Sequence, residues 1–277
     1  MDAPVSMPVE TRPRAARFTL PGTPAIADYT VRVRTSLERD SAGVTEQDMV
    51  ESSARVQLVL RRDVRGGLRG TGRVDSFTVK ATGASVRSSL RTSGSAATAA
   101  PPPPPLLNVN IDVLLDSAFV RATVRPSPAN ECDRPDVAAA GLARDLLVRV
   151  PQSVAVGDMW SDTLVAFVCR GGVPITLRTT IETRADGTDD NDRRLRLKRR
   201  MSTKLEGITR SPWRQVELTG EGRGTQDVTL DLVRGTLLDL DGESTLTFRI
   251  ANGSLRDAAR TQQVVQKSSV QVRFVRP

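Results

Sequence analysis

Histidine is absent from this chain of 277 residues, and aromatic side chains are scarce, with six Phe, two Trp and one Tyr. A chain without histidine cannot build a Ser-His-Asp triad, a Cys-His dyad or a zinc site of the usual ligand types. Few aromatics mean that a core must consist mainly of Val, Leu and Ile. They also argue against single-stranded nucleic acid as a partner, because its binders stack bases on aromatic side chains.

Long apolar runs are missing as well. No stretch approaches the ~20 residues of a membrane span, so we expect no transmembrane segment. The first 25 residues lack the apolar core of a signal peptide. If the protein is exported, we therefore expect the printed sequence to be its mature form with Met1 added. Neither a G-x-G-x-x-G turn nor a phosphate-binding loop precedes a helix, and we expect no cofactor.

Only two cysteines are present, Cys132 and Cys169. An even pair in a basic, β-rich chain fits an oxidising compartment, and we predict a disulfide between them. Two buried free thiols in a cytosolic protein are the alternative. The disulfide would place the protein outside the cytosol, in the periplasm or at the outer envelope.

Lysine is rare too, so arginine carries most of the positive charge behind the net charge of +8. Basic chains can bind nucleic acid or anionic membranes. Here the arginines alternate along predicted strands and do not cluster. This pattern favours a solvated sheet face over a site for polyanions, and we expect no nucleic acid partner.

The chain is rich in two-residue alternation, as in the apolar positions of residues 175–181 and 270–274. Successive side chains of a strand point to opposite faces, so the pattern indicates a sheet with one apolar and one polar face. It predicts strands over residues 28–38, 53–61, 71–80, 107–115, 118–124, 163–169, 174–184, 193–205, 213–219, 225–233, 244–250 and 261–274.

The predicted fold is therefore mainly β, with one large curved antiparallel sheet or half-barrel of about 10–12 strands. Residues 133–148 predict one short helix packed on it, since Asp133 can cap and Pro135 suits a first turn. Residues 1–25 are predicted to be a flexible tether, and residues 26–277 a single domain with a disordered insertion at 82–105. Two sandwich-like halves meeting near residue 130 are the alternative.

Glycine and aspartate gather at predicted connections. Gly220 to Gly224 is interpreted as a hairpin or bulge between two strands. Pairs such as Asp241-Gly242, and the run Ala185-Asp186-Gly187, are interpreted as turns. The acidic run from Asp186 to Asp192 can be a solvated hairpin tip or a calcium site, although its spacing does not match a calcium-binding loop.

The segment Val154-Ala155-Val156-Gly157-Asp158-Met159-Trp160 is the most distinctive one. Gly157 and Asp158 predict a structural turn, and Trp160 an anchor in the core or a ligand contact. A helix, a proline and this V-x-V-G-D-x-W segment ahead of strands resemble an uncharacterised family of bacterial envelope proteins. That family is similar in outline to the half-barrels of lipoprotein carriers. The resemblance implies an exported protein with an apolar cavity, although a lipid-anchoring cysteine is missing at the start.

These observations lead to three functional hypotheses. The first is a non-enzymatic envelope protein that binds a lipid-like or other hydrophobic molecule between sheet and helix, with Trp160, Trp213, Leu246 and Phe248 as contacts. The second is an envelope module that binds another protein or has a structural role. The third is a hydrolase that uses carboxylates. A continuous apolar cavity favours the first, a filled core the second, and a cleft with paired carboxylates the third.

Overall fold

The computed structural model describes residues 16–17, 25–41, 44–62, 68–83, 107–115, 120–125, 146, 148, 150–151, 153–170, 173–189, 191, 193–210, 215–253 and 260–275. All regular structure in these residues is strand. The strands are β1 (Ala16–Arg17), β2 (Ala25–Ser41), β3 (Val44–Arg62), β4 (Leu68–Gly83), β5 (Leu107–Leu115), β6 (Val120–Arg125), β7 (Ser153–Val154), β8 (Met159–Arg170), β9 (Val173–Asp189), β10 (Arg194–Arg210), β11 (Gln215–Asp231), β12 (Thr236–Gly253) and β13 (Arg260–Val275).

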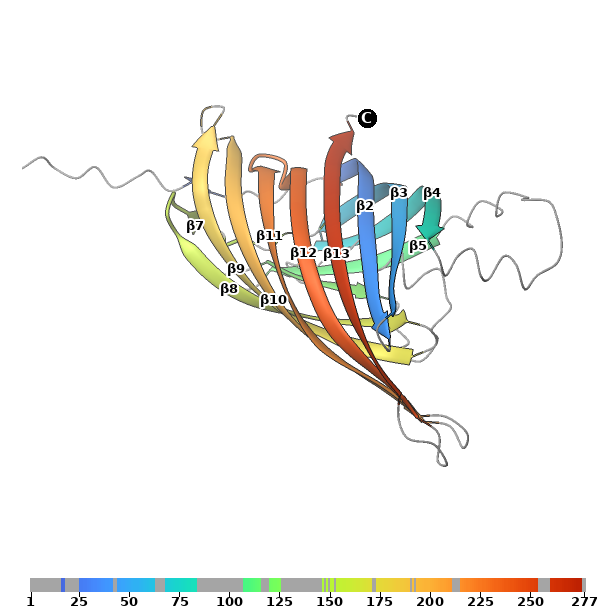
Figure 1. The fold of residues 1–277 in the computed structure, drawn as a ribbon. Coiled ribbons are helices and arrows are strands. Elements are labelled where there is room, and N and C mark those ends of the chain that lie inside the picture. The colour runs from blue at the N-terminus through green and yellow to red at the C-terminus, as the bar shows by residue number, and fades with distance from the viewer. Residues whose placement is uncertain are drawn as a thin grey trace, which may run out of the picture.

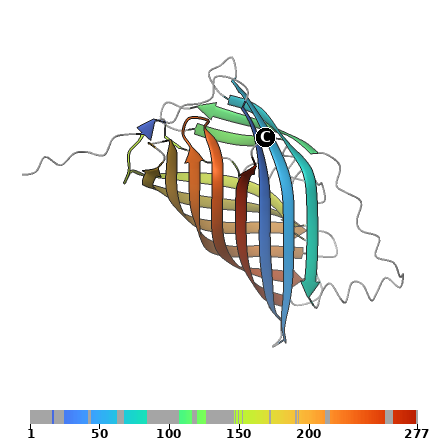
Figure 2. The same ribbon diagram turned by 90° about the horizontal axis from the view of Figure 1, so that it is seen from above.

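Eleven strands form one antiparallel sheet in the order β6-β5-β4-β3-β2-β13-β12-β11-β10-β9-β8. The first long strand, β2, pairs with the last strand, β13, in the interior of the sheet. On either side of this pair the neighbouring strands are consecutive in the chain. The outermost strands of the sheet, β6 and β8, do not pair with each other, so the described sheet is open and strongly curved (Figures 1 and 2).

Alternating side chains give the sheet two different faces. In β9, for example, Ile175, Ile181 and Ala185 are buried while Arg178 and Arg184 on the other face are exposed. Register carries this division from strand to strand, so that apolar positions lie opposite apolar positions. We call the two sides the apolar face and the polar face.

Two buried clusters occupy the apolar face. The upper cluster, near the C-terminus in Figure 1, contains residues of β2–β4 and of β8–β10, which are separated by three other strands. The cluster also includes residues of the intervening strands β11–β13, and all its buried members are at most 8% exposed. A curved sheet can cover its own side chains only on the concave side, so the apolar face is the inner one. The lower cluster lies toward the other end of the same strands and contains Val173, Ile175, Leu205, Val216, Leu218, Phe248 and Val264.

Several predicted turns proved to be continuous strand. Gly220, Gly222 and Gly224 lie within β11, and Asp241-Gly242 lies within β12. The glycines of β11 are on the apolar face, where side chains of neighbouring strands occupy the space above them. A Cβ at Gly220 would be 2.5 Å from the Cβ of Phe248, and one at Gly222 would be 2.9 Å from Leu246 Cδ1. The glycines thus make room for large side chains on the neighbouring strand. Glycine is also typical of turns, so the sequence alone does not distinguish the two roles.

Other boundaries also differ from prediction. Ala185-Asp186-Gly187 belongs to β9 and lies beside a register shift in its pairing with β10. The strand predicted to begin at residue 53 begins at Val44, and the two first residues of the predicted insertion, Thr82 and Gly83, end β4. The remainder of that insertion, residues 84–105, lies outside the described residues.

The predicted tether is fixed at one point, because Ala16 and Arg17 pair with Val154 and Ser153. The predicted helix, residues 133–148, lies outside the described residues except for Leu146 and Val148, which are not helical. Leu146 is buried in the upper cluster, so this end of the segment packs on the apolar face. The predicted disulfide also cannot be followed, since Cys132 lies outside the described residues and only the backbone of Cys169 is described, in β8.

Candidate functional site

The Gly157-Asp158 segment forms a tight turn that leads into β8. The backbone N–H of Asp158 donates to the Ala155 carbonyl at 3.1 Å, and Gly157 has a positive φ of 95°. The Asp158 carboxylate accepts from the Ala155 N–H at 2.7 Å. Backbone hydrogen bonds of Gly157 and Asp158 with Ala185 attach the turn to β9. These contacts are local and structural, and they hold the following residue pair Met159-Trp160 at the sheet edge.

The predicted ligand contacts lie in separate places. Trp160 is buried in the upper cluster with 8% of its surface exposed, and Phe248 is buried in the lower cluster. Leu246 is half-buried and packs against the lower cluster. Trp213 lies outside the described residues. The structure thus puts Trp160, Leu246 and Phe248 on one face but not around one point.

Between the two clusters, the apolar face has a middle section of half-buried side chains, which we call the inner belt. Its apolar members are Leu177, Met201 and Leu246, and its polar members are Thr35, Thr179, Arg199, Thr203, Gln226, Ser244, Gln266 and Ser268. Solvent reaches all of these side chains in part. The inner face therefore changes from apolar to mixed and back to apolar along the strands.

Hydrogen bonds fix the polar part of the inner belt. Arg199 Nη1 donates to Gln226 Oε1 at 2.8 Å, and Gln266 Nε2 donates to the Ser268 hydroxyl at 2.9 Å. The hydroxyls of Thr179 and Thr203 lie 3.0 Å apart. These pairs bridge adjacent strands or neighbouring positions of one strand. They satisfy half-buried polar groups while leaving hydroxyl and amide groups that can bind a further polar molecule.

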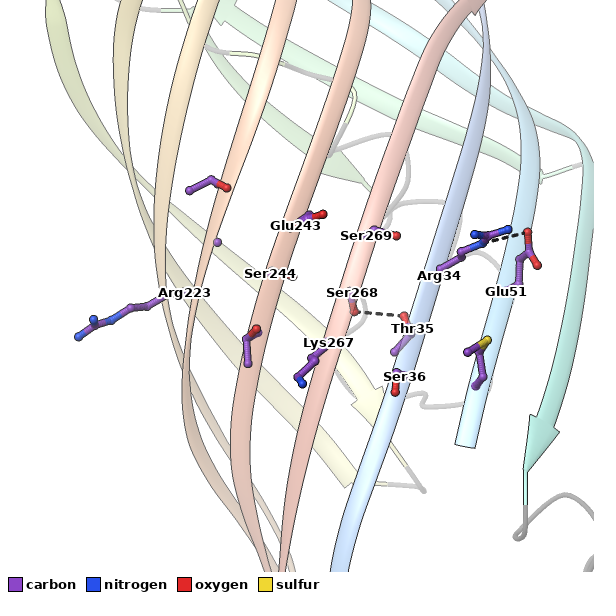
Figure 3. Close-up of a pocket in the computed structure, with 14 residues that line it drawn as sticks. Arg34, Thr35, Ser36, Glu51, Arg223, Glu243, Ser244, Lys267, Ser268 and Ser269 are labelled. Atoms are coloured by element: carbon purple, nitrogen blue, oxygen red, sulfur yellow. Dashed lines mark hydrogen bonds and ion pairs between the residues drawn. The ribbon is translucent and has the colours of Figure 1, made fainter. Parts of the chain in front are cut away.

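A second feature is an open hollow of about 800 Å³ on the polar face (Figure 3). It crosses the five adjacent strands β3, β2, β13, β12 and β11 between two rows of side chains. One row is Glu51, Arg34, Ser269, Glu243 and Thr225, and the other is Met49, Ser36, Lys267, Thr245 and Arg223. The residues between the rows, Thr35, Ser268, Ser244 and Gly224, also line the hollow, and the first three belong to the inner belt as well. We call it the transverse hollow.

The second of these rows continues across the sheet. Register extends it to Ser202, Thr180 and Thr163 on one side and to Thr82 on the other. This hydroxyl row (Thr163, Thr180, Ser202, Arg223, Thr245, Lys267, Ser36, Met49, Thr82) spans nine strands and contains no carboxylate. Adjacent strands lie about 4.8 Å apart, so the row is about 38 Å long.

Several ion pairs on the polar face join residues of adjacent strands. In the transverse hollow, Arg34 Nε lies 3.4 Å from Glu51 Oε1. Farther along β13, Arg273 makes two hydrogen bonds with the Asp241 carboxylate, and these bonds raise the pKa of Arg273. Among the described residues, no carboxylate lies within ion-pair distance of Arg223 or Lys267.

The described residues contain no group of three or more carboxylates or cysteines able to hold a metal ion. Of the acidic run considered for calcium, Asp186 lies 3.4 Å from Lys198 Nζ, whereas Asp190 and Asp192 lie outside the described residues. In the same part of the chain, no helix is long and apolar enough to cross a membrane.

Neither the inner belt nor the hydroxyl row was predicted from the sequence. Each is assembled across strands, and the residues involved are far apart in the chain. Alternation assigns a residue to a face, but only the pairing register shows which residues lie beside it. The signal that could have found the row is the run of Ser and Thr at polar-face positions of many strands, such as Thr180, Ser202 and Thr245.

No protein-family model matches the chain, and no curated protein matches it. Among solved structures, it is similar to the Pseudomonas aeruginosa protein OpdQ, with 5% identity, a TM-score of 0.22 and coverage of 90% of this chain and 98% of the other. It is also similar to Acinetobacter baumannii OccAB4, with 6% identity, a TM-score of 0.21 and coverage of 91% and 100%. At such TM-scores these likenesses support no conclusion about fold or function.

Proposed function

We propose that the protein is a non-enzymatic component of the cell envelope that binds an amphipathic, lipid-like ligand on the inner face of its curved sheet. The observation that carries the proposal is the inner belt. There, half-buried apolar side chains lie next to hydrogen-bonded polar groups on the inside of the curve. A filled core would bury these positions, as it does in the two flanking clusters.

The chemistry of the inner belt suits a molecule with two kinds of surface. Leu177, Met201 and Leu246 offer apolar contact beside the lower cluster, which would accept a hydrocarbon chain. The amide of Gln226 and the hydroxyls of Thr179 and Thr203 offer donors and acceptors for a polar head group. Ligand sites commonly combine such an apolar lining with a few polar groups that fix orientation.

Placement in the envelope is supported by the pair Cys132 and Cys169 and by the V-x-V-G-D-x-W segment. Free-thiol titration of the unreduced, denatured protein tests the first point. No reactive thiol is expected, and two would contradict export into an oxidising compartment.

Titration with a fluorescent fatty acid tests the ligand. We expect saturable binding to the purified chain and a loss of at least about tenfold in affinity for Leu246→Arg, since about 1.4 kcal/mol corresponds to tenfold. Thr245→Arg is the matched control, because Thr245 is the adjacent residue on the opposite face. Leu177→Ala, a milder change on the inner belt, covers the case in which Leu246→Arg does not fold.

An interaction module without a ligand is the second candidate. It is favoured by the dense packing of the flanking clusters, in which Leu195, Leu197, Ile175 and Leu205 are at most 1% exposed. If no fatty acid, phospholipid or hydrophobic dye binds the folded protein, this second function replaces the first.

A further inference from the structure

The transverse hollow and the hydroxyl row form a surface that the proposed ligand site does not use. They lie on the polar face, opposite the inner belt, and their side chains are mostly exposed. Their residues come from nine strands that register brings into line. A partner bound there would lie across the strands, not along them.

The side chains of this surface select the chemistry of the partner. The hydroxyl row combines Ser and Thr hydroxyls with Arg223 and Lys267 and has no acidic member. Hydroxyls bind the hydroxyl groups of sugars, and the two cations bind carboxylate or sulfate groups through charge-assisted hydrogen bonds. Two strand spacings, about 10 Å, separate Arg223 from Lys267. The opposite wall holds the ion pair of Arg34 with Glu51, together with Ser269, Glu243 and Thr225, whose oxygen atoms can pair with sugar hydroxyls.

Arg223 and Lys267 combine two properties: they line the transverse hollow, and no described carboxylate pairs with them. Some exposed cations of the face are paired, whereas others, such as Arg55 and Arg249, have no described carboxylate partner but lie outside the hollow. Arg273 is matched by Asp241, and Lys198 by Asp186. Arg223 and Lys267 have no carboxylate of a described residue within 4 Å. An anionic partner would therefore gain contact with them without breaking an ion pair.

The location of the aromatic side chains favours an acidic polysaccharide over single-stranded nucleic acid as the partner. The aromatic residues whose side chains the structure describes (Tyr29, Trp160, Phe248 and Phe274) all lie on the apolar face. Nucleic acid single strands depend on stacking against aromatics, and a hydroxyl-rich surface gives them only phosphate contacts. An acidic sugar chain needs no stacking partner to use hydroxyls and cations.

We propose that the transverse hollow and the hydroxyl row bind a linear acidic polysaccharide that runs across the strands of the polar face, with its acidic groups at Arg223 and Lys267. The length of the row, about 38 Å, accommodates several sugar residues. The two rows of side chains that would bind the polysaccharide lie on the face opposite the inner belt, and the two sites share only the residues between the rows, Thr35, Ser244 and Ser268.

Calorimetric titration of the full chain with polygalacturonate tests the proposal, with neutral dextran and single-stranded DNA as comparison polymers. We expect binding of polygalacturonate that weakens as salt is raised and no binding of dextran. The double variant Arg223→Ser with Lys267→Ser should lose about tenfold or more in affinity. The matched double variant Arg55→Ser with Arg249→Ser removes the same charge from exposed positions outside the hollow and should bind like the parent chain.

Three results would overturn the proposal. The first is no binding of polygalacturonate at low salt. The second is equal loss in the two double variants, which would mean attraction by net charge alone. The third is tighter binding of single-stranded DNA than of polygalacturonate.

Thr245→Glu, which places a carboxylate in the middle of the row, should weaken binding more than Thr219→Glu, an exposed position of the same face outside the hollow.

Discussion

Tyr29 is a titratable residue buried among apolar side chains. It is 2% exposed in the upper cluster, and its ring meets that of Phe274 edge to face at 5.9 Å between centroids. Burial raises the pKa of its phenol far above the ordinary value of about 10, and a hydrogen bond with the Leu237 backbone offsets only part of that shift. Because the folded-state pKa is above the unfolded one, Tyr29 supports folding below pH ~10 and opposes it as pH rises further.

The chain contains a single tyrosine, so tyrosinate absorbance reports this residue alone. We predict that tyrosinate appears only as the sheet unfolds, at a pH above ~10, and that both changes coincide. Tyr29→Phe should unfold at higher pH than the parent, at a cost of about 1 kcal/mol at neutral pH for the lost hydrogen bond. Tyrosinate that titrates near pH 10 in a chain with native circular dichroism would contradict the burial of Tyr29.

Gly220 is a second residue whose role is set by its neighbours. An added methyl group would lie 2.5 Å from both Phe248 Cβ and the Thr247 carbonyl oxygen, and backbone cannot move aside cheaply. We predict that Gly220→Ala lowers the free energy of unfolding by about 1–3 kcal/mol, despite the lower chain entropy that alanine gives the unfolded state. Urea unfolding measures this change. Thr219→Ala, one residue away on the exposed face, should change stability by less than about 0.5 kcal/mol.

At the scale of elements, the turn before β8 depends on backbone conformation and not on packing. Gly157 has a φ of 95°, and no atom lies within 4 Å of the position that a Cβ would take. We therefore predict that Gly157→Ala costs about 1–2 kcal/mol through the strain of a positive φ alone. Gly157→Asn should cost less, because asparagine tolerates positive φ better. Equal losses for alanine and asparagine in thermal unfolding would show that something else in the turn is disturbed.

The same elements show what sequence could predict. Alternation identified the antiparallel sheet and the approximate positions of most strands, because each residue of a two-faced strand reports its own side. The pattern did not predict strand at Gly220–Gly224 and at Asp241-Gly242, where glycine leaves space for a larger side chain on the adjacent strand. It also failed at residues 44–52, where few apolar side chains mark either face and the buried position 48 is an aspartate.

The candidate sites were less predictable for a related reason. Leu246 was expected to contact ligand and lies on the inner belt, but Arg199, Met201 and Gln226 were not singled out. Their neighbourhood depends on a register that links β10, β11 and β12. The arginines were predicted to lie on a solvated face, and most described ones do. That Arg223 lies near Lys267, however, follows only from the pairing of β11 with β12 and of β12 with β13.

For the whole molecule, the order of strands predicts tolerance to a change of connectivity. Asp28 of β2 lies opposite Val275 of β13, so the two ends of the sheet-forming chain are adjacent. We predict that a permuted chain, with a short linker from residue 275 to residue 25 and new ends between β4 and β5, keeps the fold and melts within about 5 °C of the parent. New ends between Glu243 and Ser244, in the middle of β12, should prevent folding. Circular dichroism and thermal melting of the two permuted chains check both outcomes.

The pairing of β2 with β13 also determines when the sheet can be completed during synthesis. The strands β2 to β6 leave the ribosome first, and β2 then has one hydrogen-bonding edge without its final partner. That partner is β13, which follows all the other described strands in the chain, so the edge stays open until those strands have been made. An open strand edge recruits other strands. A chain that stops before β13 would therefore be split at the centre of the sheet, and aggregation of the nascent protein would be greatest just before β13 is made.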